Sequence, residues 1–96
     1  YKIMTIQEVL QSGKYHLIDV REPMELMMDG AIDGATNIPL GEVPDRIQEI
    51  KDMDGAKIVY CRSGNRSGQA IAFLQQNGLE DLYNGGGYAD MVAVLG

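Results

Sequence analysis

The amino-acid sequence predicts an α/β domain with a mainly parallel sheet that is flanked by helices on both faces. Short apolar runs of strand length alternate along the chain with segments whose apolar residues recur at helical spacing. Strands that alternate with helices imply right-handed crossovers and parallel pairing. The chain has 96 residues, 45% of them apolar and 23% charged, which suffices for one compact domain, residues 1–96, and is too short for two.

Patterns in the first half of the chain predict three helical segments and two strands. Thr5 is placed to cap the first helix, and Pro39 ends the second strand. The last helical segment follows Pro44 and spaces its apolar residues as a helix does. In chain order, the predicted elements are a helix at 6–13, a strand at 16–20, one or two helical turns at 24–28, a strand at 35–39 and a helix at 43–50.

The second half of the chain contains the clearest buried strand, "AKIVYC", which ends at Cys61. A helix follows it, for which Ser67 is the candidate N-cap and Gly78 the candidate C-terminal stop. The three glycines from Gly85 to Gly87 predict a turn beside the loop that follows Cys61. The predicted elements are a strand at 56–61, a helix at 67–78, a short strand at 80–84 and a final helix at 88–95.

The composition argues against several classes of site and partner. One cysteine allows no internal disulfide, and with a single histidine it leaves no Cys/His cluster for a zinc site, so we expect no metal and no cofactor. The net charge of −6 argues against nucleic acid and an anionic membrane surface as partners. A free thiol without a secretory signal pattern favours the cytoplasm.

Charge is distributed unevenly around the cysteine. From residue 55 to residue 79 the chain has no Asp or Glu, although Lys57, Arg62 and Arg66 all lie in this segment. An acidic protein therefore has one locally cationic segment, and Cys61 lies at its centre. The alternative is that these cations merely solvate a loop.

The loop after the clearest strand lies at the carboxyl end of a predicted parallel sheet, where ligands gather in such folds. Amide N–H groups at the start of the next helix are unpaired, and a helix N-terminus carries partial positive charge. Together with Arg62 and Arg66, these amides would favour the thiolate of Cys61 and hold an anionic substrate. Gly64 and Asn65 would let the loop curl until its amides converge.

The segment "CRSGNR" (61–66) resembles the active-site loop of rhodanese-type sulfurtransferases, in which a cysteine opens a six-residue loop that ends in arginine. Three further segments are similar to other signatures of the family: "LIDVREPMEL" at 17–26, with Asp19, Arg21 and Glu25 in the expected places, "GAIDGATNIP" at 30–39 and "NGGGYADM" at 84–91. In the last two segments, Ala31 and Met91 stand where this family usually has histidine and tryptophan. We interpret both as packing positions.

The resemblance implies a mainly parallel five-stranded sheet flanked by helices and a ping-pong sulfurtransferase reaction. Cys61 would take a sulfane sulfur from thiosulfate or a persulfide and pass it to cyanide or a thiol. The implied partners are a small anionic donor, that acceptor and a sulfur-relay protein. Asp19 and Arg21 would support the loop. The residues implied to bind the substrate are Arg62, Ser63, Gly64, Asn65, Arg66 and Ser67.

Two other functions remain open on the sequence alone. Cys-based phosphatases and arsenate reductases of the same fold family place five residues between cysteine and arginine. Four residues separate Cys61 from Arg66, which makes a cradle better sized for sulfur than for a phosphoryl group. The second alternative is a non-catalytic rhodanese-like module that binds partners or carries sulfur; such modules often lose the cysteine, which this chain keeps.

Two other sets of side chains invite a functional interpretation that we do not favour. Acids that flank a strand end are usually solvated, so we expect no hydrolytic carboxylate pair there. Methionines at helical spacing usually fill the core or its rim and do not form a cofactor site. The two sets are Asp19, Glu22 and Glu25, and Met24, Met27 and Met28.

Overall fold

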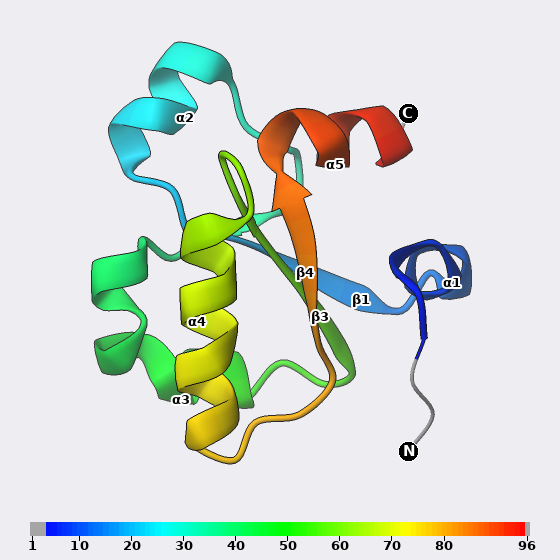
Figure 1. The fold of residues 1–96 in the computed structure, drawn as a ribbon, viewed down its shortest axis with the longest axis vertical. Coiled ribbons are helices and arrows are strands. Elements are labelled where there is room, and N and C mark those ends of the chain that lie inside the picture. Colours follow the sequence, from blue (N-terminus) through cyan, green and yellow to red (C-terminus); the bar gives the residue numbers. More distant parts are fainter. Residues whose placement is uncertain (1–3, 96) are drawn as a thin grey trace.

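The computed structural model describes residues 4–95, in which a parallel sheet has helices on both faces (Figure 1). Its strands lie in the order β2-β1-β3-β4, and every neighbouring pair is parallel. The central strand β3 is buried along its whole length, as "AKIVYC" predicts. The predicted α/β class is therefore confirmed. The strands are β1 (Tyr15–Asp19), β2 (Thr36–Asn37), β3 (Ala56–Cys61) and β4 (Leu82–Gly87).

The sheet has four strands in the described part of the chain, so the prediction of five is corrected. The four segments with a strand pattern form these four strands, whereas the intervening segments carry helical or turn patterns. β2 is shorter than the predicted strand at 35–39. The predicted strand begins at Ala35, whose N–H instead donates to Ile32 O at 3.1 Å in a turn. It ends at Pro39, which has no N–H to donate to a neighbouring strand.

Five α-helices and two 3-10 turns connect the strands within residues 4–95. Thr5 caps the first helix as predicted: its Oγ1 accepts a hydrogen bond from the Glu8 N–H at 3.1 Å, and Glu8 Oε1 accepts one from the Thr5 N–H at 2.9 Å. None of the described helices is long and apolar enough to cross a membrane. The elements are α1 (Ile6–Ser12), α2 (Pro23–Asp29), η1 (Leu40–Glu42), η2 (Pro44–Arg46), α3 (Ile47–Lys51), α4 (Asn65–Gln76) and α5 (Tyr88–Leu95).

Alternate residues of β3 enter two separate cores, one on each face of the sheet. Val59 and Cys61 pack with α4 and the segment that contains η1, η2 and α3, whereas Ile58 and Tyr60 pack with α1 and α5. Figure 1 shows α4 on one side of the sheet and α1 and α5 on the other. Helices therefore cover both faces, and Cys61 belongs to the face covered by α4.

α4 begins two residues earlier than predicted. Gly64 is its N-cap, with a φ of +97° in the left-handed region, so Ser67 is not the N-cap. Ser67 is instead buried in the first turn of the helix. Asn65 is already helical, and the curl of the loop therefore depends on Gly64 alone. The predicted stop at Gly78 is confirmed, because this residue has a φ of +84° and its N–H closes the last turn.

The segment from Gly85 to Gly87 continues β4, so the prediction of a turn there is wrong. A Cβ at Gly85 would lie 2.6 Å from Met91 Sδ, and a Cβ at Gly87 would overlap Arg62 O. Any larger side chain would force these elements apart. Glycine thus lets β4 run close both to the core under α5 and to the loop after Cys61.

Burial separates the predicted packing positions into two groups. Met91 is fully buried, which confirms its prediction, but Ala31 is exposed and packs no core. The prediction that the α2 methionines fill the core or its rim is wrong: Met24, Met27 and Met28 are 68%, 85% and 79% exposed.

Candidate functional site

Cys61 is the last residue of β3, and its side chain is fully buried at the carboxyl end of the sheet. The chain turns back directly after it, and the Gly64 N–H donates a hydrogen bond to Cys61 Sγ at 3.0 Å. The turn favours glycine, because its φ of +97° lies in the left-handed region that side chains rarely adopt. The loop therefore directs a backbone donor at the sulfur.

The surroundings of Cys61 favour its thiolate at neutral pH. Burial raises the pKa of the thiol, but hydrogen bonds that stabilise the thiolate outweigh it and lower the pKa to about 7. The groups that lower it are the hydroxyl and N–H of Ser67 and the N–H groups of Ser63 and Gly64. A substantial fraction of the sulfur is therefore deprotonated and nucleophilic at neutral pH.

Ser67 and Asn84 form a hydrogen-bond network next to the sulfur. Ser67 Oγ lies 3.6 Å from Cys61 Sγ and donates to Asn84 Oδ1 at 2.7 Å. Asn84 Nδ2 donates in turn to Gly64 O at 3.1 Å. Because Ser67 has one hydroxyl proton, it cannot donate to Asn84 and to the thiolate at the same time. In this arrangement backbone N–H groups remain to stabilise the thiolate, and that of Gly64 lies 3.0 Å from Sγ.

Arg66 is held by a bidentate ion pair with Glu25 of α2. Its Nη1 and Nη2 lie 2.7 Å and 2.8 Å from the two carboxylate oxygens. Hydrogen bonds from Arg66 lower the pKa of Glu25 to about 2, and Glu25 raises the pKa of Arg66, so both groups are charged at neutral pH. The pair fixes the guanidinium beside the loop and offsets part of its charge.

Arg62, Ser63 and Asn65 are exposed on the outside of the loop. The Arg62 side chain makes no hydrogen bond or ion pair with any residue between 4 and 95. Its guanidinium is therefore available to an anion that arrives from solvent, whereas the guanidinium of Arg66 is already engaged by Glu25.

Asp19 and Arg21 form a buried ion pair at the same edge of the sheet. Both side chains are 1% exposed, and Arg21 Nη2 donates to Asp19 Oδ2 at 2.7 Å and to Gly30 O at 3.0 Å. The guanidinium also lies 4.2 Å from the centre of the Tyr88 ring. Asp19 holds the pKa of Arg21 above its ordinary value. The pair connects the end of β1 with the end of α2 and the start of α5.

Glu25 and Asn84 belong to the site although the residue patterns alone did not indicate them. Glu25 is 41 positions from Arg66, and Asn84 is 17 positions from Ser67, so only the tertiary fold brings each pair together. The expectation of solvated acids is wrong for Asp19, which is buried, and for Glu25, which is ion-paired. The available signal for Glu25 was its place in the segment "LIDVREPMEL".

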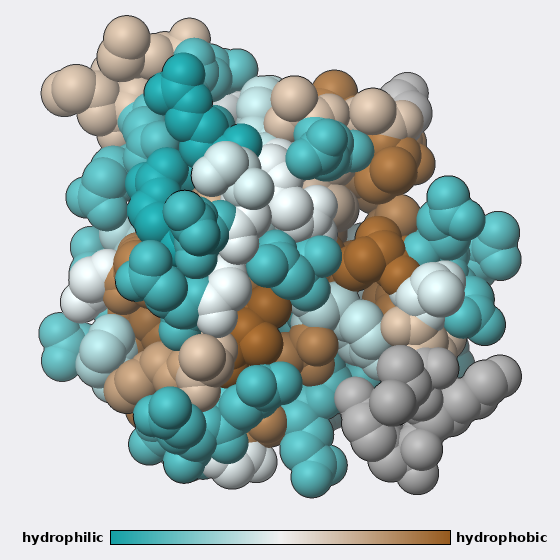
Figure 2. Space-filling model, viewed as in Figure 1, coloured by the Kyte–Doolittle hydropathy of each residue, from teal (hydrophilic) through white to brown (hydrophobic). Residues whose placement is uncertain are grey.

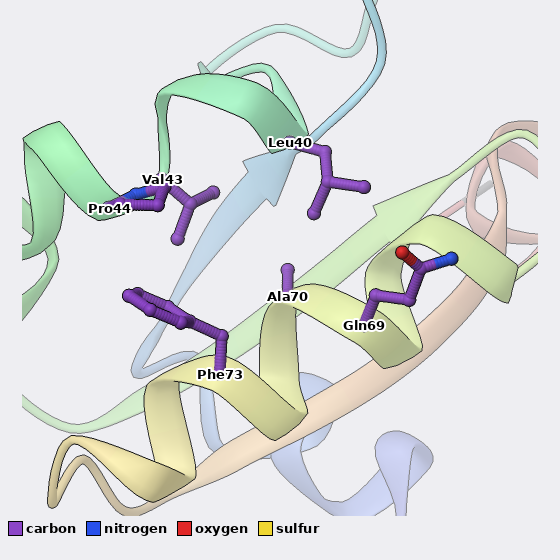
Figure 3. A pocket seen from close by; sticks show the side chains of 6 residues that line it. All are labelled: Leu40, Val43, Pro44, Gln69, Ala70 and Phe73. Carbon is purple, nitrogen blue, oxygen red and sulfur yellow. The ribbon is translucent and has the colours of Figure 1, made fainter.

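A separate apolar pocket of about 190 Å³ lies between α4 and the segment of η1 and η2 (Figure 3). Figure 3 shows Ala70 and Phe73 of α4 facing Leu40 and Val43 across the gap. None of its lining side chains is titratable or nucleophilic, so the candidate chemistry lies at Cys61. The lining residues are Leu40, Val43, Pro44, Gln69, Ala70 and Phe73.

Comparison with protein families identifies one match over nearly the whole chain. The model of the family described as "Rhodanese-like domain" matches residues 5–94. This range contains the loop after Cys61 and both ion pairs of the site.

Two curated relatives and one solved structure are similar to the chain. It is 45% identical to the uncharacterized protein YqhL of Bacillus subtilis over 80 residues, which cover 81% of this chain and 62% of the relative. It is 40% identical to thiosulfate sulfurtransferase PspE of Escherichia coli over 77 residues, which cover 79% of this chain and 73% of PspE. A structure described as rhodanese with anions from E. coli superimposes with a TM-score of 0.69 at 39% identity, covering 79% of this chain and 89% of that one. The chain thus spans less than two thirds of the length of YqhL.

The pKa of Cys61 predicts how the thiolate forms with pH. The difference in ultraviolet thiolate absorbance between the wild type and Cys61→Ser should rise with a midpoint near pH 7. The absorbance should be low below this pH, where the thiol is protonated, and should reach a plateau above it. In denaturant the midpoint should return to about 8.5. A native midpoint at or above the denatured value would contradict the proposed stabilisation of the thiolate.

Proposed function

The chain belongs to the rhodanese-like domain family, and from this premise we propose that it is a sulfurtransferase. It moves a sulfane sulfur from thiosulfate or a persulfide donor to a thiophilic acceptor such as cyanide or a thiol. The observation that carries the proposal is the Gly64 N–H hydrogen bond to a buried Cys61 Sγ whose pKa is about 7. A nucleophile that is preformed as a thiolate needs no separate general base.

The reaction proceeds in two displacements at sulfur. The Cys61 thiolate attacks the outer sulfur of thiosulfate, the sulfur–sulfur bond of the donor breaks, and its electron pair leaves with sulfite. The enzyme then holds the sulfur as a Cys61 persulfide. Cyanide attacks the terminal sulfur, the bond to Cys61 Sγ breaks, and the electron pair returns to Cys61 as thiolate while thiocyanate leaves.

The loop and the start of α4 hold the transferred sulfur in this proposal. Backbone N–H groups of Ser63, Gly64 and Asn65 stabilise a negatively charged terminal sulfur, as does the partial positive charge at the start of α4. Ser67 and its partner Asn84 keep the first turn of the helix against β4, which is consistent with their hydrogen bonds at the base of the loop.

The two loop arginines take different roles. Arg62 is exposed and unengaged, so it attracts the anionic donor from solvent. Arg66 is fixed by Glu25 and keeps a positive charge beside the loop, where it favours the thiolate of Cys61. Asp19 and Arg21 support the loop from the neighbouring strand end and do not touch the reacting sulfur.

The size of the loop favours sulfur transfer over phosphate hydrolysis. Four residues separate Cys61 from Arg66, and the Gly64 N–H points at the cysteine sulfur itself. A phosphatase loop would have to surround a tetrahedral phosphoryl group with several donors, which requires a wider cradle. A non-catalytic carrier module differs from the enzyme only in turnover, which experiment distinguishes.

Intact-mass spectrometry after incubation with thiosulfate tests the proposed function. The wild-type protein should gain the mass of one sulfur atom, lose it when cyanide is added, and turn over thiosulfate and cyanide repeatedly. Cys61→Ser should neither gain sulfur nor catalyse the reaction. A mass that does not change, or substantial activity of Cys61→Ser, would refute the mechanism. A single cycle of loading and discharge without turnover would select the carrier module, and hydrolysis of an aryl phosphate without sulfur loading would select the phosphatase.

Substitution of the loop arginines separates attraction of the donor from catalysis. Arg62→Gln should raise the KM for thiosulfate about three- to tenfold with little change in kcat, because an exposed charge contributes about 1 kcal/mol to binding. The rise in KM should shrink in high salt.

Arg66→Gln should lower kcat at least about tenfold, because it removes a fixed charge and leaves Glu25 unpaired near the thiolate.

Lys14→Gln is the matched control for both variants, because Lys14 is an exposed cation at the opposite end of β1. It should leave both kinetic parameters unchanged. An Arg62→Gln variant with an unaltered KM, or an Arg66→Gln variant that differs only in KM, would show that the two roles are assigned incorrectly.

A further inference from the structure

Three exposed methionines form an apolar surface on α2, which we call the α2 methionine face. Met24, Met27 and Met28 are 68%, 85% and 79% exposed. Their spacing places them on neighbouring turns of one side of the helix. In Figure 2, weakly hydrophobic side chains project at the corner of the molecule that α2 occupies, next to strongly hydrophilic ones. A small protein rarely exposes adjacent large apolar side chains without a partner for them.

The fold does not need these methionines. No residue of α2 is fully buried, and the helix is held by the Glu25–Arg66 ion pair and, at its C-cap, by the hydrogen bond from Arg21 to Gly30 O. The methionine side chains therefore contribute little to the stability of the folded chain. Their chemistry suits contact with another molecule, because methionine is flexible and polarisable and adapts to irregular surfaces.

The helix that carries the α2 methionine face is joined to the start of α4 by the Glu25–Arg66 ion pair. Met24 and Met28 lie one and three positions from Glu25 in the sequence, and the charge of Arg66 interacts with that of Cys61. Figure 1 shows α2 at the end of the molecule where β3 meets α4. A molecule that brings a thiol to the buried Cys61 sulfur from this side would cover the methionines.

The segment that carries the α2 methionine face is acidic. From Glu22 to Asp33 the chain has four acids and no Lys or Arg, and of these acids Glu25 is ion-paired with Arg66. Asp29 and Asp33 are exposed, and their side chains make no hydrogen bond or ion pair within residues 4–95. Asp29 ends α2, where a carboxylate is unfavourable to the helix dipole, so it does not serve the helix.

We propose that the α2 methionine face docks a protein whose own cysteine takes the sulfur from Cys61, and that this cysteine lies in an exposed segment with apolar and basic side chains. The proposal rests on the sulfurtransferase function proposed above. The apolar side chains would cover the methionines, and the basic ones would meet the acids. A second copy of this chain would place acid against acid, and an anionic membrane would be repelled.

The transfer step balances without any further reactant. The partner's thiolate attacks the terminal sulfur of the Cys61 persulfide. The bond between that sulfur and Cys61 Sγ breaks, its electron pair returns to Cys61 as thiolate, and the partner leaves as a persulfide. Docking would raise the local concentration of the partner's thiol at the loop without any change in this chemistry.

Two synthetic peptides with one cysteine each test the proposal. One carries leucine and lysine around the cysteine, and the other carries serine and glutamate at the same positions. The protein is loaded with sulfur from thiosulfate, and discharge is followed by mass spectrometry with each peptide and with cyanide. The rate at which each peptide's thiol reduces a small disulfide is measured separately, and the discharge rates are corrected by it for the intrinsic reactivity of the two thiols. The corrected rate should be about tenfold higher for the apolar, basic peptide and should fall in high salt.

The triple variant M24Q/M27Q/M28Q should reduce this preference several-fold and leave only its salt-dependent part, because the acids are retained. Discharge to cyanide should stay unchanged, because glutamine has similar length and helix propensity. The control V92Q/V94Q replaces exposed apolar residues of α5, which are 44% and 49% exposed, and should keep the preference. Equal corrected rates for the two peptides, or a preference that is undiminished in the triple variant, would overturn the proposal. A dimer of this chain that dissociates in the triple variant would overturn it as well.

Binding of the apolar, basic peptide with serine in place of cysteine separates docking from sulfur transfer. Fluorescence anisotropy should show binding to the wild type and weaker binding, by about tenfold, to M24Q/M27Q/M28Q. If this binding is found but Cys61 accepts no sulfur, the proposed function fails while the docking surface stands. If Cys61 discharges to cyanide but the peptide does not bind, the docking surface fails alone.

Discussion

The hydrogen bond from the Gly64 N–H to Cys61 Sγ is the interaction on which the rest of the site depends. It requires β3 to end at Cys61, α4 to begin at Asn65 and the backbone between them to pass through a left-handed glycine. Since the sulfur is buried, a thiolate there needs donors supplied by the protein. The pKa of about 7 shows that these donors outweigh the cost of burial. The junction of strand and helix thus creates the nucleophile.

The elements around this junction have complementary tasks. β4 approaches the loop closely because it is built from glycine where it passes Arg62, and Asn84 joins it to the start of α4. The Glu25–Arg66 pair ties α2 to the loop, which leaves Arg62 as the cation open to solvent. The same pair joins the helix that carries the exposed methionines to the start of α4. Under the proposed function, an anionic donor would meet Arg62 and a protein acceptor would meet the methionines.

The sequence was sufficient to predict the features that depend on local patterns. The four strands, the cap at Thr5, the stop at Gly78 and the loop after Cys61 all follow from periodicity and turn chemistry. Features that depend on contacts between distant segments could not be predicted in this way. The pairing of Glu25 with Arg66 and the burial of Asp19 are of this kind.

One further error has a local physical reason. The residues from Gly85 to Gly87 indicate a turn because glycine favours turns, yet they form a strand because only glycine fits the space beside Met91 and Arg62.

The most direct test of the central claim is the amide chemical shift of Gly64, followed by NMR across the neutral pH range in the wild type and in Cys61→Ser. We expect it to titrate with a midpoint of about 7 in the wild type and not at all in the variant. A chemical shift that does not change with pH, or one with a midpoint at or above about 8.5, would contradict the claim that this amide stabilises the thiolate.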